Sequence, residues 1–383
     1  MTIQPLPASL WAATACAMPV GHALDADLRA AVVIVGAGFT GLSAALHLAE
    51  TGKKVVLLEA SEPGWGASGR NGGQIIAGLK HDPEMLAALV GAELGARVTQ
   101  EFGGGADLVF SLIERHGMDC QAKRSGWIQG AHGKKAFDEM VAPRCRQWAA
   151  LGVGARLLDR VEMSAMLGSR PRAYYGGWFD PRGGVLQPLS YARGLAAAAI
   201  AQGAGIFPRS PVHALRRKGN QWEVAAAGGR VVAPSVILAT TAYTDGLLPG
   251  LRRTVIPVAS FQAATRPLPG AIRDAILPGG QGVADTRRLL LYFRLDHEGR
   301  LVIGGRSPVD DAPRFEDART LQAVIGRLFP NAAGQQLEFV WSGKVAITKD
   351  KMPHLHVLAP GLFAALGFNG RGVAACTVMG RLL

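Results

Sequence analysis

The stretch AVVIVGAGFTG at residues 31–41 decides the fold of this chain. Its first five residues are an unbroken run of small and β-branched apolar side chains, which is typical of a parallel strand buried on both faces. Three glycines follow within six residues, and residues 42–51 then carry apolar side chains at helical spacing. The stretch therefore predicts a strand, a glycine turn and a helix.

A second apolar strand, at residues 54–58, ends at Glu59 and completes a β-α-β unit of about 30 residues. In such a unit the first glycine allows a tight turn, the second lets the backbone approach a pyrophosphate, and the third lets the helix pack against the sheet. The helix start offers free N–H groups to phosphate, and Glu59 can accept hydrogen bonds from both ribose hydroxyls. The predicted dinucleotide contacts are Gly36, Gly38, Phe39, Thr40, Gly41, Glu59 and Ala60.

The composition excludes several classes of protein. With 383 residues, 49% hydrophobic and 18% charged, the chain is long enough for two domains and too apolar to be disordered. Four cysteines without a CxxC pair argue against a disulfide scaffold and favour a reducing, cytoplasmic location. No apolar run is as long as a membrane span, and no Lys or Arg precedes Arg29, so the basic start of a secretory signal is missing.

The net charge of +12, from 41 Lys and Arg against 29 Asp and Glu, permits an acidic partner. The basic residues are scattered, and the densest group, at residues 216–218, is only three long. We therefore expect a solvated basic surface and no specific nucleic-acid partner. His354 and His356 lie two apart without a third ligand, so we expect no metal site.

Four segments resemble the D-amino-acid-oxidase-like superfamily of FAD enzymes, and within it the gamma-glutamylputrescine oxidoreductases and related amine and amino-acid oxidoreductases. They are residues 32–60, the glycine-rich loop GWGASGRNGGQ at 64–74, residues 231–243 and residues 341–372. The resemblance covers nearly the whole chain from about Arg29. Its cofactor motifs are specific to the superfamily and not to one substrate.

The resemblance implies where FAD is held. It implies contacts at Ser68, Gly69, Arg70, Asn71, Gly72, Gly73, Gln74, Val212, Thr240, Gly367, Asn369, Gly370, Gly372 and Val373. The N–H groups and dipole at the start of the last helix would stabilise the negative charge of a reduced flavin. Covalent relatives carry a cysteine where this chain has residues 345–347, Val-Ala-Ile, so we expect non-covalent FAD.

The resemblance also implies the reaction, which is hydride transfer from an amine or amino acid to flavin N5, followed by hydrolysis of the imine. A γ-glutamylated polyamine is the leading substrate. Arg294 could hold a carboxylate bidentately, Tyr292 would face the flavin, and Arg371 would line the entrance; Trp178 is more often a core residue than a ligand wall. Oxygen or a quinone would accept the electrons, although no lysine stands near residues 302–303 to activate oxygen as in some relatives.

The expected fold is α/β, with a doubly wound FAD-binding Rossmann-type domain and an inserted α+β substrate domain built on an antiparallel sheet. The FAD-binding domain would comprise residues 29–85, 186–250 and 341–383, the substrate domain 86–185 and 251–340, and residues 1–28 an extended lead-in. One alternative is a tRNA-modifying FAD oxidoreductase of the same superfamily. The other is a truncated flavin-binding protein without activity, because the sequence ends at 380–383 inside its last predicted helix.

Overall fold

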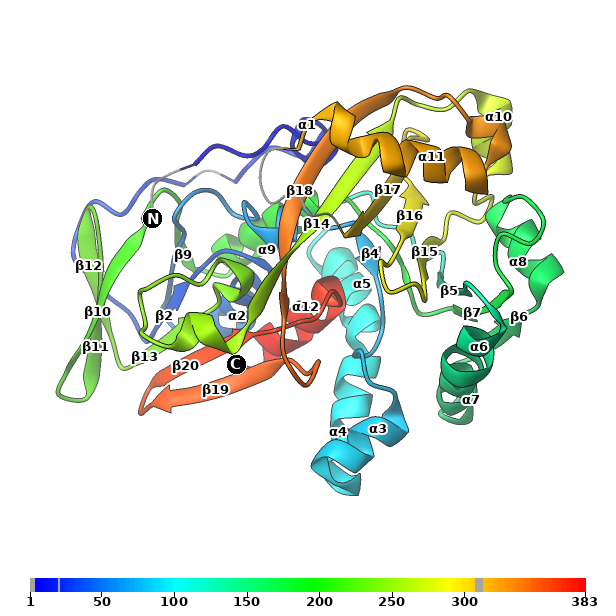
Figure 1. The fold of residues 1–383 in the computed structure, drawn as a ribbon. Helices are drawn as coiled ribbons and strands as arrows, with labels where there is room; N and C mark the ends of the chain where they lie inside the picture. The colour runs from blue at the N-terminus through cyan, green and yellow to red at the C-terminus, as the bar shows by residue number, and fades with distance from the viewer. Residues whose placement is uncertain (1–3, 20, 307–312) are drawn as a thin grey trace.

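A computed structural model describes residues 4–19, 21–306 and 313–383. Two large sheets lie in one body, with strand orders β19-β20-β13-β2-β3-β9 and β18-β14-β17-β16-β15-β5-β7-β6 (Figure 1). The first sheet contains β2 (Val32–Val35), β3 (Val55–Leu58), β9 (Gly205–Phe207), β13 (Ser235–Leu238), β19 (His354–Ala359) and β20 (Leu362–Leu366). Its strands run parallel except for β19 at the edge.

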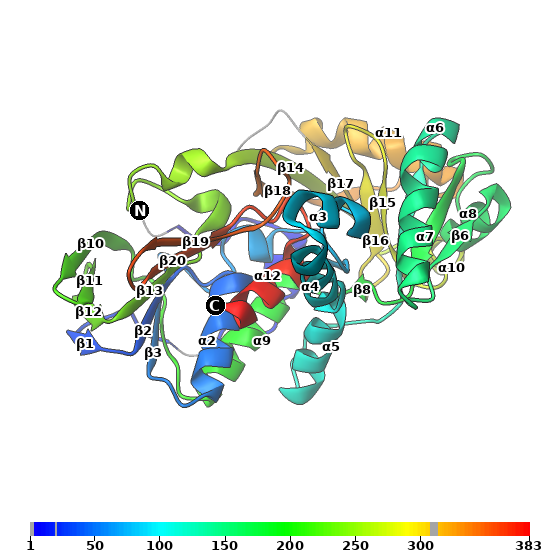
Figure 2. The same cartoon turned by 90° about the horizontal axis from the view of Figure 1, so that it is seen from below.

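The parallel strands are short apolar runs because both faces of their sheet are covered. All four residues of β2 and of β3 are buried, as expected for a parallel sheet with no solvent face. One face packs on α2 (Phe39–Glu50), α9 (Pro188–Ala201) and α12 (Gly372–Leu382), and α2 contacts both of the other helices (Figure 2). The predicted first strand, helix and second strand are confirmed.

The opposite face of this sheet is covered by a small sheet instead of by helices. That sheet contains β1 (Leu28–Arg29), β12 (Gly229–Ala233), β11 (Gln221–Ala226) and β10 (Val212–Lys218), in this order. Val33 and Leu58 of the parallel sheet share a core with Val224 and Val231 of the small sheet. The Rossmann-type fold is therefore confirmed, with a helical layer on one side and a β layer on the other.

The second large sheet is mainly antiparallel, as predicted for the substrate domain. It contains β5 (Trp127–Ala131), β6 (Arg156–Leu158), β7 (Gly176–Asp180), β14 (Ile256–Thr265), β15 (Gly282–Asp285), β16 (Tyr292–Leu295), β17 (Leu301–Arg306) and β18 (Leu337–Ile347). Only β15 and β5 pair in parallel among its described strands. Helix α11 (Arg319–Leu328) packs on this sheet with an apolar face, on which Leu321, Val324, Ile325 and Leu328 are buried.

The structure divides the chain differently from the expected domain boundaries. Strand β18 pairs with β14 along its length, so residues 341–347 belong to the antiparallel sheet. Helices α4 (Ala92–Gly103) and α5 (Gly105–Arg115) fall in the expected substrate domain, yet Phe102 and Leu112 join the core beneath α2 and α12. A sequence pattern shows that a helix has an apolar face, but it does not show which body covers that face.

Glycines divide the helical segment that follows Asp82. Helix α3 (Pro83–Val90) ends at Gly91, where α4 begins, and Val90 and Leu94 on either side of this turn are exposed. A second interruption at Gly104 separates α4 from α5.

Helix α9 is capped by the side chain of Gln187, which accepts the N–H of Ser190 at 2.7 Å. Pro143 is accommodated at the start of α7 (Ala142–Ala150), directly after a π-turn at Phe137–Val141. The lead-in is not wholly extended, because Leu10–Thr14 form the short helix α1.

The remaining elements are short. They are α6 (Lys134–Ala136), α8 (Arg160–Leu167), α10 (Gly270–Ala275), β4 (Gln74–Ile75), β8 (Gly184–Val185), η1 (Ala67–Gly69), η3 (Thr241–Tyr243), η4 (Leu251–Thr254), η5 (Phe315–Ala318) and η6 (Pro330–Ala332). In the described parts of the chain, no helix has the length and apolar character needed to cross a bilayer.

The contact between α2 and α12 predicts a sensitive glycine. A Cβ at Gly380 would lie 2.5 Å from the Cβ of Ser43 and 2.6 Å from the carbonyl oxygen of Thr40. Ala usually stabilises a helix by about 1 kcal/mol relative to Gly, but here we expect Gly380→Ala to destabilise the protein by about 1–3 kcal/mol through overpacking. Urea unfolding measures this change. The control is Gly270→Ala in α10, where a Cβ meets open space, and equal effects of the two variants would contradict the prediction.

Candidate active site

The turn between β2 and α2 has the geometry that its glycines predict. Gly36 has a φ of +105° and its N–H donates to the carbonyl of Leu58 at 2.9 Å. A Cβ at Gly41 would lie 2.0 Å from the carbonyl oxygen of Gly36, so only glycine allows the helix to start this close to the strand. Gly38 precedes the helix and has no side chain to cap it, so among the described residues the first-turn N–H groups other than that of Phe39 have no side-chain acceptor.

Glu59 lies beside this turn, as predicted. One carboxylate oxygen accepts the N–H of Ala37 at 2.7 Å and the other accepts the N–H of Ser61 at 2.9 Å. Burial raises the pKa of Glu59, and the hydrogen bonds from Ala37, Ser61 and Ala60 lower it by a smaller amount. Each oxygen keeps acceptor capacity, so the carboxylate can also receive two ribose hydroxyls.

The glycine-rich loop is fastened to the start of α2. The Oγ atom of Ser68 accepts the N–H of Phe39 at 2.9 Å, and a Cβ at Gly38 would lie 3.0 Å from the same oxygen. A Cβ at Gly69 would lie 2.4 Å from the carbonyl oxygen of Gly64, so this position needs glycine. Two sequence-predicted motifs thus meet at one place, with Thr40 buried beneath them.

Two more predicted segments reach the same turn. Thr240 follows β13, and a Cβ at Gly36 would lie 3.0 Å from the carbonyl oxygen of Ala239. The N–H of Ser210 donates to the carbonyl of Glu59 at 2.8 Å, which places the start of β10 and its buried Val212 near the acid. The structure therefore brings the predicted dinucleotide residues together from four segments.

The other end of the loop is shaped by Arg294. Its guanidinium donates to the carbonyls of Gly72 at 2.9 Å, Leu186 at 2.7 Å and Leu295 at 3.3 Å. Burial lowers the pKa of Arg294 to about 10. Because Arg294 donates to backbone oxygens, we interpret it as a residue that holds the loop. This differs from the expectation that it would bind a substrate carboxylate.

Tyr292 and Gln74 also hold this end of the loop. The Tyr292 ring would lie 2.9 Å from a Cβ at Gly72, and its hydroxyl bonds to the Oγ atom of Ser260 at 2.8 Å. Burial raises the pKa of Tyr292, so its phenol stays protonated at neutral pH. The Gln74 amide donates to β15 and β16, at the carbonyls of Val283 and Phe293, and accepts the indole N–H of Trp127 at 3.0 Å.

Arg70 and Asn71 stand in the middle of the loop. Arg70 donates to the carbonyl of Trp65 at 2.8 Å and lies over its ring at 4.3 Å. The Asn71 amide donates to the carbonyl of Ser68 at 2.7 Å and accepts the N–H of Gly73 at 2.8 Å. A cavity of about 270 Å³ beside them is lined by Gln4, Trp65, Arg70, Tyr243, Ser342, Gly343 and Lys344.

The segment before the last helix has unusual backbone angles and is held by β18. Gly367, Asn369 and Gly370 all have positive φ angles, and Asn369 is fixed because its side-chain oxygen accepts the N–H of Thr348 at 3.0 Å. No described heavy atom lies within 4 Å of a Cβ at Gly370. Helix α12 begins at Gly372, with Val373 buried, so its N-terminal N–H groups follow an unobstructed glycine.

Arg371 is a buried cation whose neighbours the sequence did not reveal. Its guanidinium lies 5.0 Å from the centre of the Trp127 ring and donates to the carbonyl of Ala77 at 3.3 Å. Nearby, Arg144 pairs with Asp82 and Arg182 pairs with Asp180, whereas no carboxylate of the described ranges lies within 4.0 Å of Arg371. Burial is the main cause that lowers its pKa, to about 9. These residues come from separate segments, so no local pattern could have joined them.

The sequence left open whether Trp178 belongs to the core or lines a ligand site. In the structure it is a core residue. It is almost fully buried, its ring meets Trp127 edge to face, and its N–H donates to the side chain of Gln129 at 3.1 Å.

The residues present fit FAD. A side chain at Gly36 or Gly41 would meet backbone atoms, and Glu59 lies beside this turn. The buried Oε1 atom of Gln262, near Gly72, has no hydrogen-bond partner among the described residues. An orphaned buried acceptor is rare in proteins and suits a site that a bound group completes. Fold and site together define a dinucleotide-binding protein of the Rossmann type.

Comparison with known proteins identifies the family. Residues 31–383 match the model of the DAO family, described as FAD dependent oxidoreductase, and the chain belongs to this family. It is 34% identical over 361 residues to a probable oxidoreductase OrdL of Haemophilus influenzae, covering 93% of this chain and 82% of that protein. It is 30% identical over 383 residues to the gamma-glutamylputrescine oxidoreductase of Escherichia coli, covering 98% and 86%. The crystal structure of glycine oxidase from Geobacillus kaustophilus has the same fold, with a TM-score of 0.76 at 24% identity over 92% of this chain and 93% of that one.

Glu59 predicts how FAD affinity depends on pH. Protonation removes an acceptor for the ribose hydroxyls, and burial raises the pKa of this carboxyl. Lowering the pH through that raised value should therefore weaken FAD binding. Glu59→Gln should weaken FAD binding by about tenfold, because one oxygen cannot serve both backbone donors, and should remove the dependence on pH.

Fluorescence titration of the apoprotein with FAD between pH 4.5 and 8 measures both effects. Glu62→Gln is the control, since Glu62 pairs with Arg193 instead of with the glycine turn. An unchanged affinity in Glu59→Gln would show that this acid does not contact the cofactor.

Proposed function

We propose that the protein dehydrogenates an amine or amino acid that carries a carboxylate, with FAD bound non-covalently. A γ-glutamylated amine is the leading substrate. Membership of the DAO family and the 30% identity to gamma-glutamylputrescine oxidoreductase support the reaction class. Oxygen or a quinone would accept the electrons.

The observation that carries the proposed substrate class is Arg371. A buried guanidinium without a carboxylate partner is costly, and its two neighbouring arginines already have acidic partners. A substrate carboxylate would supply the missing charge. Amino acids carry such a group beside the reacting carbon, and a γ-glutamylated amine carries it on its glutamyl end.

In the proposed reaction the protein side chains bind and orient the substrate, and the cofactor carries out the redox chemistry. FAD, when bound, supplies the acceptor for hydride from the carbon next to the substrate nitrogen. The N-terminal N–H groups of α12 offer partial positive charge to a neighbouring anion. Arg371 would orient the substrate through its carboxylate, while Trp127 beneath it excludes water from that side.

Anaerobic mixing of the holoprotein with candidate substrates tests this proposal. We expect γ-glutamylputrescine or an amino acid to bleach the flavin absorbance and putrescine, which lacks a carboxylate, to leave it unchanged. Arg371→Met should raise the KM for the substrate by at least about tenfold, because a charged hydrogen bond is lost. Arg381→Met is the control, since Arg381 pairs with Glu101 on the surface of the same helix.

Bleaching by putrescine alone would contradict the need for a carboxylate. Bleaching by a tRNA that carries an aminomethyl nucleoside, with no response to small amines, would favour the tRNA-modifying alternative. A holoprotein that no candidate reduces would contradict the proposed activity.

The non-covalent attachment is tested separately. Residues 345–347 on β18 offer no nucleophilic side chain, so we expect acid precipitation of the holoprotein to release all of the flavin into the supernatant. Yellow colour or fluorescence that stays with the denatured polypeptide would contradict this expectation.

A further inference from the structure

The carbonyl groups of the glycine-rich loop are held from outside by a set of donors. The Arg70 carbonyl accepts the Gln262 amide and the indole N–H of Trp341, the latter at 3.0 Å. The next carbonyl, that of Asn71, accepts the indole N–H of Trp11 at 2.7 Å. Arg294 binds the carbonyl of Gly72, and the N–H of Leu186 donates to that of Gly73 at 2.8 Å.

This arrangement fixes the direction of two N–H groups. In a trans peptide the N–H points opposite to the carbonyl of the preceding residue. The carbonyls of Arg70 and Asn71 face their donors, so the N–H groups of Asn71 and Gly72 face the other way. Neither donates to a protein acceptor within the part of the chain that the structure describes. They are therefore available to a group bound at the loop.

Trp11 differs from the other donors because it comes from the N-terminal lead-in. Ser9 caps α1 by accepting the N–H of Ala12 at 3.1 Å. Leu10 and Trp11 are almost fully buried. They share a small core with Leu189, Ala264, Val302 and Trp341, which come from both halves of the molecule.

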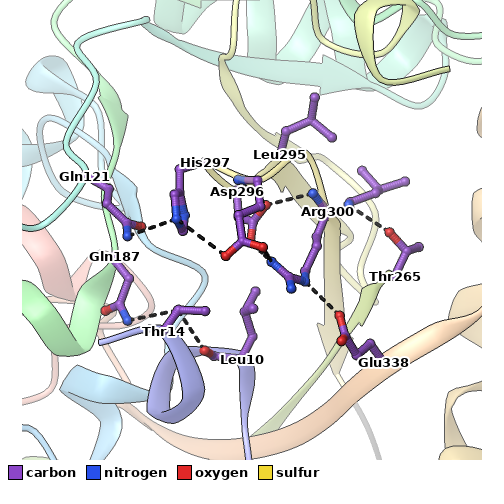
Figure 3. Close-up of polar contacts among 12 residues, drawn as sticks. Leu10, Thr14, Gln121, Gln187, Thr265, Leu295, Asp296, His297, Arg300 and Glu338 are labelled. Carbon is purple, nitrogen blue, oxygen red and sulfur yellow. Dashed lines mark hydrogen bonds and ion pairs between the residues drawn. The ribbon is translucent and has the colours of Figure 1, made fainter. Parts of the chain in front are cut away.

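Polar contacts fasten the same helix. The Gln187 amide donates to the carbonyl of Trp11 at 2.8 Å and to the hydroxyl of Thr14 at 3.2 Å. Figure 3 shows Thr14 between Gln187 and the Leu10 carbonyl, which it reaches at 2.8 Å. The same view shows the β16–β17 turn, where Arg300 pairs with Asp296 and with Glu338 of β18. These ion pairs join the β16–β17 turn to β18, the strand that also carries the donor Trp341.

We infer that Trp11 is a positioning residue for the cofactor loop. Its indole N–H holds the Asn71 carbonyl outward and thereby aims the Gly72 N–H into the site where the flavin would bind. The Arg294 guanidinium lies 4.9 Å from the centre of the Trp11 ring, so the same side chain also supports the next donor of the set. This inference rests on the proposed function only in that FAD binds at this loop.

Trp11→Phe tests the inference because it keeps an aromatic ring in the core and removes the indole N–H; the smaller ring is the reason for a second Trp→Phe variant as control. We expect FAD to bind about fivefold more weakly, as for loss of one hydrogen bond. We also expect a shifted flavin absorption spectrum, and faster hydrogen–deuterium exchange of the loop peptide at residues 70–75 in the apoprotein.

Trp222→Phe is the matched control. Its indole N–H also donates to a backbone carbonyl, that of Pro360 at 3.1 Å, far from the loop in sequence. We expect it to lower thermal stability by a similar amount without changing FAD affinity or loop exchange. Ser9→Ala, which removes the cap of α1 and leaves the indole intact, should cause smaller changes of the same sign as Trp11→Phe.

Unchanged FAD affinity, spectrum and loop exchange in Trp11→Phe would overturn the inference, as would equal changes in Trp222→Phe. If the wild type binds FAD but no amine reduces it, the proposed reaction fails while the role of Trp11 is still decided by these measurements. A wild type that binds no FAD would overturn both.

Discussion

The close approach of helix α2 to strand β2 is the contact on which the rest of the site depends. Gly41 lies against the carbonyl of Gly36, with no room for a Cβ between them. This contact fixes where the helix starts, and therefore where its free N–H groups and partial positive charge are directed. Ser68 binds the same helix start, and Glu59 accepts the N–H of Ala37 in the same turn.

The two halves of the molecule meet at the glycine-rich loop, whose backbone is held from both sides. One end is bonded to α2 through Ser68, and the other to the antiparallel sheet through Gln74 and Arg294. Glycine at positions 72 and 73 is required because the Tyr292 ring and the Arg294 guanidinium occupy the space of a side chain. The loop carbonyls of residues 70–73 all accept hydrogen bonds, whereas the N–H groups of Asn71 and Gly72 have no acceptor among the described residues.

The sequence predicted the nucleotide-binding unit well because its signals are local. A strand, a turn that needs glycine and a helix face each depend on residues within one turn or one strand of each other. Prediction was weaker where partners are distant in the chain. Arg294 was expected at a substrate carboxylate, yet its donors reach backbone oxygens more than a hundred residues away. The boundaries at residues 86 and 341 also differ from the structure, because α4, α5 and β18 pack by contacts that local periodicity does not encode.

The sequence by itself determined the β-α-β unit, the acid after the second strand, the antiparallel partner sheet and, by resemblance, the family. Only the tertiary structure decided that Trp11 reaches Asn71, that Arg371 lies apart from the acids that neutralise Arg144 and Arg182, and that a small sheet covers one face of the nucleotide-binding sheet. The physical reason is that backbone conformation follows from neighbouring residues, whereas the pairing of buried donors and charges depends on which distant segments the packed core brings together.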